Sequence, residues 1–308
     1  MRSCKKLRSL PTSIKLKSLQ VFNLNYCSQL EMFPEIEGDM GCLRNLNLNG
    51  TAIKDLPSSF EYLNGLYSLD LSDCRKLESI PSIIWKLRSL QRLDLRDCLK
   101  LEKFSEIEGD VDYLHELLLS GSAIKDIPPS IQRLNGLWNF ELNYCEKLES
   151  LPNNICKLKS LRYLTIRGCT KIKKFPEMSR EMKGLRELDL GETSIKQLPA
   201  SIGQLNNLLE LNLSGLQLEE SSFLGLCSLR VLNLSNCNLL DGSILNSVGC
   251  LSSLEVLNLS GNNFASLPAS LNQLTKLRRI HLEYCSRLQV LTSLPSSITK
   301  FLWNREPI

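Results

Sequence analysis

Residues 254–262 read Leu-Glu-Val-Leu-Asn-Leu-Ser-Gly-Asn, and the fold of the chain follows from this phrase. Near-complete copies of its pattern, Leu-x-x-Leu-x-Leu-x-x-(Asn/Cys/Thr), open at Leu19, Leu43, Leu66, Leu90, Leu114, Leu137, Leu161, Leu185, Leu208, Leu229, Leu254 and Leu277. Successive openings are 24, 23, 24, 24, 23, 24, 24, 23, 21, 25 and 23 residues apart. One unit of about two dozen residues therefore recurs along nearly the whole chain.

The second half of the unit recurs as well. Residues 148–158 read Leu-Glu-Ser-Leu-Pro-Asn-Asn-Ile-Cys-Lys-Leu, and a phrase of this form returns in most copies. Together the two halves make the leucine-rich repeat pattern. A proline at a fixed place favours an extended or turn segment over a long helix. We therefore expect only short helical or 3₁₀ turns there.

The predicted fold class is α/β: a leucine-rich repeat solenoid, or horseshoe, with a concave parallel β-sheet and a convex side of loops and short helical or 3₁₀ turns. Alternation within x-Leu-x-Leu-x places two leucines on one face of a short strand and three variable residues on the other. Stacked coils pair these strands in parallel, roughly 4.8 Å apart. The leucines then fill one continuous interior.

One position of the repeat is expected to bond the backbone groups that the chain reversal after the strand leaves inside the coil. Asn262 occupies this position in the opening phrase, and its amide can both donate and accept. Thr or Cys does the same more weakly. Seven of the 12 cysteines share the position, and we predict them to be reduced and buried, in a reducing compartment. They are Cys27, Cys74, Cys98, Cys145, Cys169, Cys237 and Cys285.

The sequence predicts three segments. Residues 1–18 match only the second half of a repeat and form a truncated first repeat, residues 19–297 hold about twelve repeats, and residues 298–308 form a last strand and a C-terminal tail. Neither end carries a recognisable cap, which terminal repeats normally need. We therefore expect a fragment of a longer polypeptide or a truncated gene product.

A larger block is also repeated. Residues 51–57, Thr-Ala-Ile-Lys-Asp-Leu-Pro, return as Ser-Ala-Ile-Lys-Asp-Ile-Pro at 122–128, which is 71 residues later (122 − 51). Residues 33–39 return at 104–110 with the same offset. Because three repeats of 24, 23 and 24 residues also add to 71, we infer that three repeats were copied as a block.

Composition excludes several classes of protein. The chain has a formal charge of +4 and 43% hydrophobic residues, which is ordinary for a folded protein. No apolar stretch approaches the roughly 18–20 residues of a membrane span. The N-terminus has basic residues without the apolar block of a secretory signal. No dense basic stripe is present, so neither nucleic acid nor a membrane is a predicted partner.

The variable strand positions are where such a protein meets a partner. Aromatic and arginine side chains are the usual anchors of protein interfaces. We predict a protein-binding surface on the concave face from the stretch richest in them. It consists of Arg92, Asp94, Arg96, Trp138, Glu141, Tyr144, Tyr163, Arg167, Glu187 and Asp189.

The same residues also have structural interpretations that involve no partner. Asn and Asp between two leucines also form a solvated polar ladder that binds nothing. Trp138 directly follows an opening leucine and could instead pack at the strand edge, and Tyr144 precedes a ladder cysteine, where a structural role fits equally well. The alternation further predicts that Leu118 is exposed on the strand face.

Catalytic, metal and cofactor motifs are absent from the sequence. It has no Gly-x-x-x-x-Gly-Lys-(Ser/Thr) loop, no His-Glu-x-x-His and no Gly-x-Ser-x-Gly elbow. His115 and His281, the 2 histidines, fall at variable positions of different coils. We predict no enzyme, no cofactor and no metal site.

Four phrases carry a resemblance to a known family. They are Asn-Tyr-Cys-(Ser/Glu)-x-Leu-Glu at 25–31 and 143–149, Phe-Pro-Glu-Ile at 33–36, Thr-Ala-Ile-Lys-Asp-Leu-Pro-Ser-Ser at 51–59 and Leu-Asn-Leu-Ser-Gly-Asn-Asn-Phe-Ala-Ser-Leu-Pro at 257–268. The chain resembles, over nearly its whole length, the repeat region of plant TIR–nucleotide-binding–leucine-rich-repeat disease-resistance receptors. The resemblance implies a cytoplasmic or nucleocytoplasmic protein whose repeats recognise a pathogen effector or a guarded host protein. It also implies that the repeats fold back on the nucleotide-binding domain of the parent receptor and hold it inactive. Neither that domain nor the TIR domain lies in this sequence.

Two other functions remain open. Leu-Pro-x-x-Ile-x-x-Leu also resembles the free-standing intracellular scaffolds of the Ras-group leucine-rich repeat proteins, although those favour uniform 23-residue repeats. An extracellular receptor ectodomain typically carries paired-cysteine caps and a Gly-x-Ile-Pro phrase, neither of which occurs here.

Overall fold

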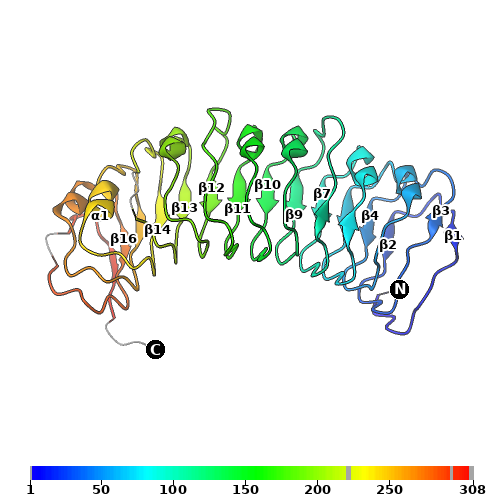
Figure 1. Cartoon of the computed structure of the whole chain (residues 1–308), viewed down its shortest axis with the longest axis horizontal. Coiled ribbons are helices and arrows are strands. Elements are labelled where there is room, and N and C mark those ends of the chain that lie inside the picture. The colour runs from blue at the N-terminus through cyan, green and yellow to red at the C-terminus, as the bar shows by residue number, and fades with distance from the viewer. Residues whose placement is uncertain (1, 220–222, 292–293, 305–308) are drawn as a thin grey trace. The chain divides into compact units, whose positions relative to one another are not determined.

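A computed structural model describes residues 2–219, 223–291 and 294–304 of the chain. The chain divides into two compact units, Met1–Leu161 and Arg162–Ile308. Each unit is a stack of coils, and each coil contributes one short strand to a parallel sheet (Figure 1). The predicted leucine-rich repeat solenoid is thereby confirmed.

The main sheet of unit 1 has one strand per repeat, paired in the order in which the strands occur along the chain. Its strands are β2 (Val21–Asn23), β4 (Asn45–Asn47), β5 (Ser68–Asp70), β7 (Arg92–Asp94), β9 (Glu116–Leu118) and β10 (Asn139–Glu141). Two small parallel pairs that the sequence did not predict, β1 (Ser13–Ile14) with β3 (Glu35–Ile36) and β6 (Ser79–Ile80) with β8 (Lys103–Phe104), join the later segments of successive coils.

Unit 2 continues the same design. Its strands, again paired in chain order, are β11 (Tyr163–Thr165), β12 (Glu187–Asp189), β13 (Glu210–Asn212), β14 (Val231–Asn233), β15 (Val256–Asn258), β16 (Arg279–His281) and β17 (Lys300–Leu302). The last of these is the strand predicted near the C-terminus. Residues 305–308 of the predicted tail, and Met1 of the truncated first repeat, lie outside the described residues.

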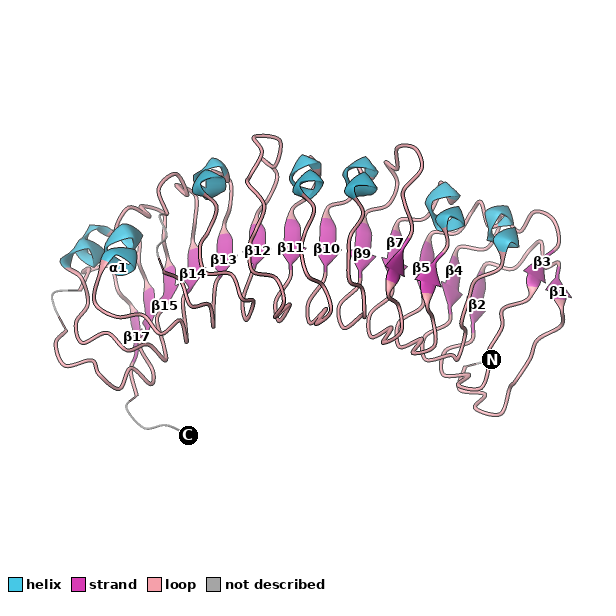
Figure 2. Cartoon of the chain, in the orientation of Figure 1, coloured by secondary structure: helices cyan, strands magenta, loops and turns pink. Residues whose placement is uncertain are grey.

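Short 3₁₀ helices occupy the side of the coils away from the strands (Figure 2), where the proline phrases predicted them. They are η1 (Ser58–Tyr62), η2 (Ser82–Lys86), η3 (Pro129–Arg133), η4 (Asn153–Lys157), η5 (Ala200–Gln204) and η6 (Ala269–Gln273). Each follows a proline whose extended backbone starts the turn. One coil has the α-helix α1 (Ser243–Val248) instead. Among the described residues, no helix is long and apolar enough to cross a membrane.

The predicted ladder position holds each coil closed from the inside. Asn262 is fully buried; its Oδ1 accepts from Cys237 N and Leu239 N, both at 3.0 Å, and its Nδ2 donates to Leu234 O and Leu259 O, both at 2.8 Å. In other coils a thiol or hydroxyl at the ladder position makes some of these hydrogen bonds. The Sγ of Cys74 donates to Leu48 O at 3.2 Å, for example.

The predicted burial of the ladder cysteines is confirmed. All seven ladder cysteines are buried, and all 12 cysteines are free thiols. Burial raises the pKa of the Cys74 and Cys237 thiols to about 11 each. These cysteines are therefore protonated interior side chains.

A clasp on the loop side joins neighbouring coils at three places. Ser59 Oγ donates to Glu35 and accepts from Ile36 N, and Ser130 does the same for Glu106 and Ile107. In unit 2, Ser201 does so for Glu177 and Met178. The glutamates are 71 residues apart (106 − 35 and 177 − 106), so the copied block is present three times rather than the two inferred from the sequence.

Candidate protein-binding surface on the strand face

The strand face is the set of outward positions of the main-sheet strands and the first outward residue after each strand. In unit 1, Arg92 and Asp94 begin and end β7, Arg96 follows two residues later, and Glu141 ends β10. In unit 2, Tyr163 begins β11, Arg167 follows that strand, and Glu187 and Asp189 begin and end β12. Eight of the ten predicted residues thus lie on the strand face, four in each unit.

Trp138 and Tyr144 lie beside the strand face. Trp138 directly precedes β10 and is half-buried, so the strand-edge alternative describes its place. Tyr144 lies in the turn after β10 with a positive φ of 57°. Its exposed ring lines a separate hollow of about 310 Å³ together with Leu99 and Lys147.

The centre of the strand face in unit 1 is a cluster of charged side chains joined by hydrogen bonds and ion pairs. Arg96 donates from Nε to Asp94 Oδ1 at 2.9 Å and from Nη2 to Oδ2 at 2.6 Å. Arg92 reaches the same carboxylate at 3.4 Å and also bonds Glu116 on the next strand. The carboxylate raises the pKa of the Arg96 guanidinium above its usual value through the hydrogen bond. Asp94 is only 4% exposed, so it holds the two arginines in place rather than meeting a partner itself.

The prediction that Leu118 is exposed is wrong. The side chain is 2% exposed because it lies in register between Asp94 and Glu141, which flank it on the two neighbouring strands. Leu118 therefore supports the strand face from below.

On the N-terminal side of this cluster the strand face carries polar side chains. Asn49 Nδ2 donates to Ser72 Oγ at 2.6 Å, and Ser72 Oγ donates to Asp70 Oδ1 at 2.5 Å. These small side chains bond one another from coil to coil. Ser72, in the middle of this row, is 9% exposed.

The strand face of unit 2 has a different charge pattern. The Nη2 of Arg167 lies 2.5 Å from Glu192 Oε1 in the turn after the next strand. Glu187 and Asp189, which begin and end β12, are both half-buried.

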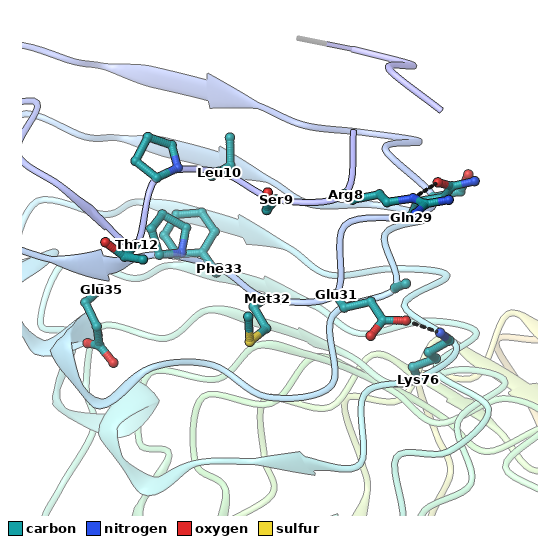
Figure 3. Close-up of a pocket in the computed structure, with 14 residues that line it drawn as sticks. Arg8, Ser9, Leu10, Thr12, Gln29, Glu31, Met32, Phe33, Glu35 and Lys76 are labelled. Atoms are coloured by element: carbon teal, nitrogen blue, oxygen red, sulfur yellow. Dashed lines mark hydrogen bonds and ion pairs between the residues drawn. The ribbon is translucent and has the colours of Figure 1, made fainter. Parts of the chain in front are cut away.

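A cavity of about 850 Å³ lies at the N-terminal coils, between residues 8–12 and 28–35 (Figure 3). Its apolar lining includes Phe33 and Met32, and Met32 is 75% exposed. At its rim Arg8 Nε donates to Gln29 Oε1 at 3.1 Å, and Lys76 Nζ donates to Glu31 Oε1 at 2.8 Å. None of the ten predicted residues lines it, so it is separate from the strand face.

The described residues contain no group of three or more His, Cys, Asp or Glu side chains able to hold a metal ion. His281 Nδ1 lies 3.5 Å from Glu283 Oε2. The sequence has no catalytic motif that would pair a nucleophile with this histidine. What the site offers is a row of positioned polar and aromatic side chains on rigid strands.

Sequence reasoning missed one set of contacts beside the strand face. Glu102 accepts from Lys125 at 2.8 Å and Lys147 at 2.7 Å, and so ties three coils together. Glu31 bridges Lys54 and Lys76 in the same way, 71 residues earlier (102 − 31). The 71-residue offset was the signal that could have found this pair of clamps.

Most of the chain matches family models of leucine-rich repeats. Residues 15–90 match the family model described as "Disease resistance protein RPS4B-like, leucine-rich repeats". Residues 113–222 match "Leucine-rich repeat region", and residues 228–251 and 253–274 match "Leucine Rich Repeat".

Two similar relatives are plant proteins. TMV resistance protein N of Nicotiana glutinosa is 35% identical over 97% of this chain and 20% of its own length. Disease resistance-like protein DSC1 of Arabidopsis thaliana is 36% identical over 49% of this chain and 13% of its own length. The chain thus spans a fifth or less of the length of these relatives.

A solved leucine-rich repeat protein of Leptospira interrogans is 25% identical, with a TM-score of 0.52 over 96% of this chain and 91% of that one. This structural similarity supports the solenoid fold. The similarity in repeat sequence is to the plant relatives. The chain belongs to the leucine-rich repeat family, and its repeats are of the type found in plant disease-resistance proteins.

Proposed function

We propose that this chain is the protein-binding region of an intracellular plant immune receptor of the TIR–nucleotide-binding–leucine-rich-repeat type. Its strand face recognises a pathogen effector or a guarded host protein in the cytoplasm, or in cytoplasm and nucleus. The same repeats hold the nucleotide-binding domain of the parent receptor inactive until recognition. The chain performs no reaction of its own and acts in defence signalling.

One observation carries the proposal. Within each unit the residues that repeat are buried, whereas the residues that differ from coil to coil lie on the strand face. Arginine and tyrosine side chains, which anchor many interfaces, are held there on strands whose backbones are fully paired. The similarity of nearly the whole chain to a plant resistance protein supports the immune setting.

The strand face is tested in the full-length receptor, expressed in leaf tissue challenged with the pathogen. Asp94→Ser and Arg96→Ser are combined with Tyr163→Ala, because removing Arg96 alone would weaken the pairing of the buried Asp94 carboxylate. The defence response is expected to disappear while the unfolding temperature of the 308-residue chain stays unchanged. A full response from this variant would contradict the proposal.

The matched control removes three cations from the 3₁₀ side. Lys86, Arg133 and Lys157 are exposed and end η2, η3 and η4. Their replacement by alanine is expected to leave the response intact, and its loss would contradict the assignment of recognition to the strand face. For the inhibitory role, deletion of the repeats is expected to give a response without pathogen, and a silent receptor would contradict it.

A further inference from the structure

The N-terminal cavity lies where the loop segments of two successive coils separate. The segments meet at one end, where Arg8 Nε donates to Gln29 Oε1 at 3.1 Å, and at the other, where Glu35 N donates to Thr12 O at 3.0 Å (Figure 3). Between these contacts the cavity measures about 850 Å³, a volume typical of ligand-binding pockets. The cavity is therefore an opening between two coils that are joined on either side of it.

The copied block shows the same place closed. Residues 4–11, Cys-Lys-Lys-Leu-Arg-Ser-Leu-Pro, correspond to residues 74–81, Cys-Arg-Lys-Leu-Glu-Ser-Ile-Pro, and residues 32–33 correspond to residues 103–104. In the later copy these segments pair as β6 and β8. In the earlier copy, within the described residues, no backbone hydrogen bond involves residues 9–10 or 32–33. Their backbone groups are therefore available to an added strand.

Met32 is the apolar residue that distinguishes this cavity from its copies. It is 75% exposed, and the corresponding residues at intervals of 71 (103 − 32 and 174 − 103) are Lys103 and Lys174. The hollow at the second copy, of about 410 Å³, is lined by Lys103 and Glu78 instead. Methionine adapts its shape to apolar partners, and it recurs at protein-binding surfaces. Its place here indicates that an apolar side chain of a partner fills the cavity.

Arg8 brings to the rim a cation that lacks a carboxylate. Its side chain bonds the neutral amide of Gln29, and no ion pair in the described part of the chain reaches it. The corresponding residues in the other copies are Glu78 and Glu149. The repeat itself therefore does not require a cation at this position.

The carboxylates that line the cavity are already engaged. Glu31 is bound by Lys54 and Lys76. Glu35 accepts from Ser59 in the clasp that recurs in the other copies. The charge left for a partner is thus the guanidinium of Arg8, and charge complementarity favours a carboxylate beside the apolar side chain.

We propose that this cavity binds an extended segment of a partner protein. A large apolar side chain of the segment lies against Met32, a neighbouring carboxylate pairs with Arg8, and the backbone bonds the groups that β6 and β8 satisfy for each other in the later copy. The cavity contains none of the ten strand-face candidates, so this inference goes beyond the proposed function and does not depend on it.

The test titrates the ¹⁵N-labelled 308-residue chain with acetyl-Leu-Glu-Leu-amide and follows the binding by NMR. Shift changes are expected in residues 8–12 and 28–35. The matched peptide acetyl-Leu-Gln-Leu-amide, which has no charge, is expected to bind about tenfold more weakly. Acetyl-Ala-Glu-Ala-amide is also expected to bind more weakly, because it buries less apolar surface. Equal binding of the three peptides, or shifts confined to other residues, would overturn the proposal.

Variants of the chain separate the two contacts. Arg8→Gln is expected to remove the preference for the glutamate peptide, and Met32→Lys, which installs the residue of the other copies, to weaken both leucine peptides. Lys103→Met, the matched change where the segments are paired, is expected to leave binding unchanged. All three side chains are exposed, so the unfolding temperature stays that of the parent chain. A preference for glutamate that survives Arg8→Gln, or binding that survives Met32→Lys, would refute the contact concerned.

Two further probes distinguish a peptide segment from a small ligand. N-methylation of the last leucine removes one backbone donor and is expected to weaken the glutamate peptide. Hexanoate has an apolar chain and a carboxylate but no peptide group, so it is expected to bind more weakly than the peptide. If hexanoate binds as tightly as the peptide, or N-methylation has no effect, the cavity does not take an added strand and the proposal is wrong.

Discussion

Asn262 illustrates at the scale of one residue how a coil is closed. Its side chain satisfies four backbone groups from two adjacent coils, all of them inside the solenoid. Asn262→Ala leaves these groups without a partner, and each such group costs about 1–3 kcal/mol when water cannot reach it. We expect a loss on the order of 4 kcal/mol in the free energy of unfolding, measured by chemical denaturation.

The neighbouring Asn263 provides the control. Its Nδ2 makes one exposed hydrogen bond, to Asn238 Oδ1 at 2.6 Å. Asn263→Ala is expected to change the free energy of unfolding by about 0.5 kcal/mol or less. Equal losses for the two variants would mean that the ladder amide is not what closes the coil.

The ladder thiols give a prediction with a pH dependence. Burial raises the pKa of the Cys74 thiol from 9.0 to about 11, and that of Cys98 further still. The unfolded chain therefore releases these protons near pH 9 while the folded chain keeps them. Their contribution to stability is complete below pH 9 and is lost as the pH rises towards 11.

Alkylation of the native chain at pH 8.5 by iodoacetamide, read by mass spectrometry, checks this protection. We expect reaction at the exposed Cys4, Cys42, Cys227 and Cys250, and at all 12 cysteines after denaturation. A ladder cysteine that reacts in the native chain as fast as Cys42 would contradict its place in the interior.

The place of Tyr144 was predictable from the sequence, whereas the pairing of Arg96 with Asp94 was not. Its position, just before the ladder residue, is glycine in other coils, including Gly50 and Gly121, where φ is 67° and 73°. That glycine was a readable signal for a left-handed turn, so Tyr144 could have been placed beside the strand face from the sequence. The pairing of Arg96 with Asp94 could not, since it depends on which of several nearby carboxylates the guanidinium reaches.

At the scale of elements, a lysine–glutamate clamp connects two coils whose strands are not neighbours, since Glu102 follows β7, Lys147 follows β10, and β9 lies between these strands. Two lysines, Lys125 and Lys147, lower the pKa of the Glu102 carboxyl to about 2, chiefly through their hydrogen bonds. The stabilisation from this clamp is present above pH 4.5 and is lost as the pH falls towards 2. Because the groups are exposed, salt screens the effect.

An NMR pH titration of the Glu102 carboxyl carbon measures this shift. Lys147→Ala is expected to raise the pKa of Glu102 towards its ordinary value, whereas Lys86→Ala, in η2 on another side of the coil, leaves it unchanged. An ordinary pKa for Glu102 in the unaltered chain would show that the clamp does not form in solution.

The elements themselves were largely readable from the sequence. The alternation predicted outward residues at Arg92 and Asp94, and β7 spans Arg92–Asp94. The proline phrases predicted the 3₁₀ helices, because proline at a fixed place both sets the extended backbone and prevents a long helix. The pairs β1–β3 and β6–β8, and the serine clasps, were not predictable, since they depend on how closely the loop segments of neighbouring coils approach.

At the scale of the whole molecule, conserved repeat positions and variable positions have different places in the fold. Residues that recur from coil to coil fill the interior, and residues that vary stand on the strand face. A repeat protein can thus change its partner without changing its core, because each coil contacts only its neighbours. The strand-face positions follow from the alternation alone, but the identity of the contacting side chains does not.

The most direct measurement compares two tyrosines by site-specific photo-crosslinking in the full-length receptor during pathogen challenge. Tyr163 begins β11 on the strand face, and Tyr62 is the exposed last residue of η1 on the opposite side of its coil. Each is replaced in turn by a photoreactive phenylalanine of similar size. We predict a crosslinked partner, dependent on the challenge, from position 163 and none from position 62. A partner captured from position 62 and not from position 163 would contradict the account.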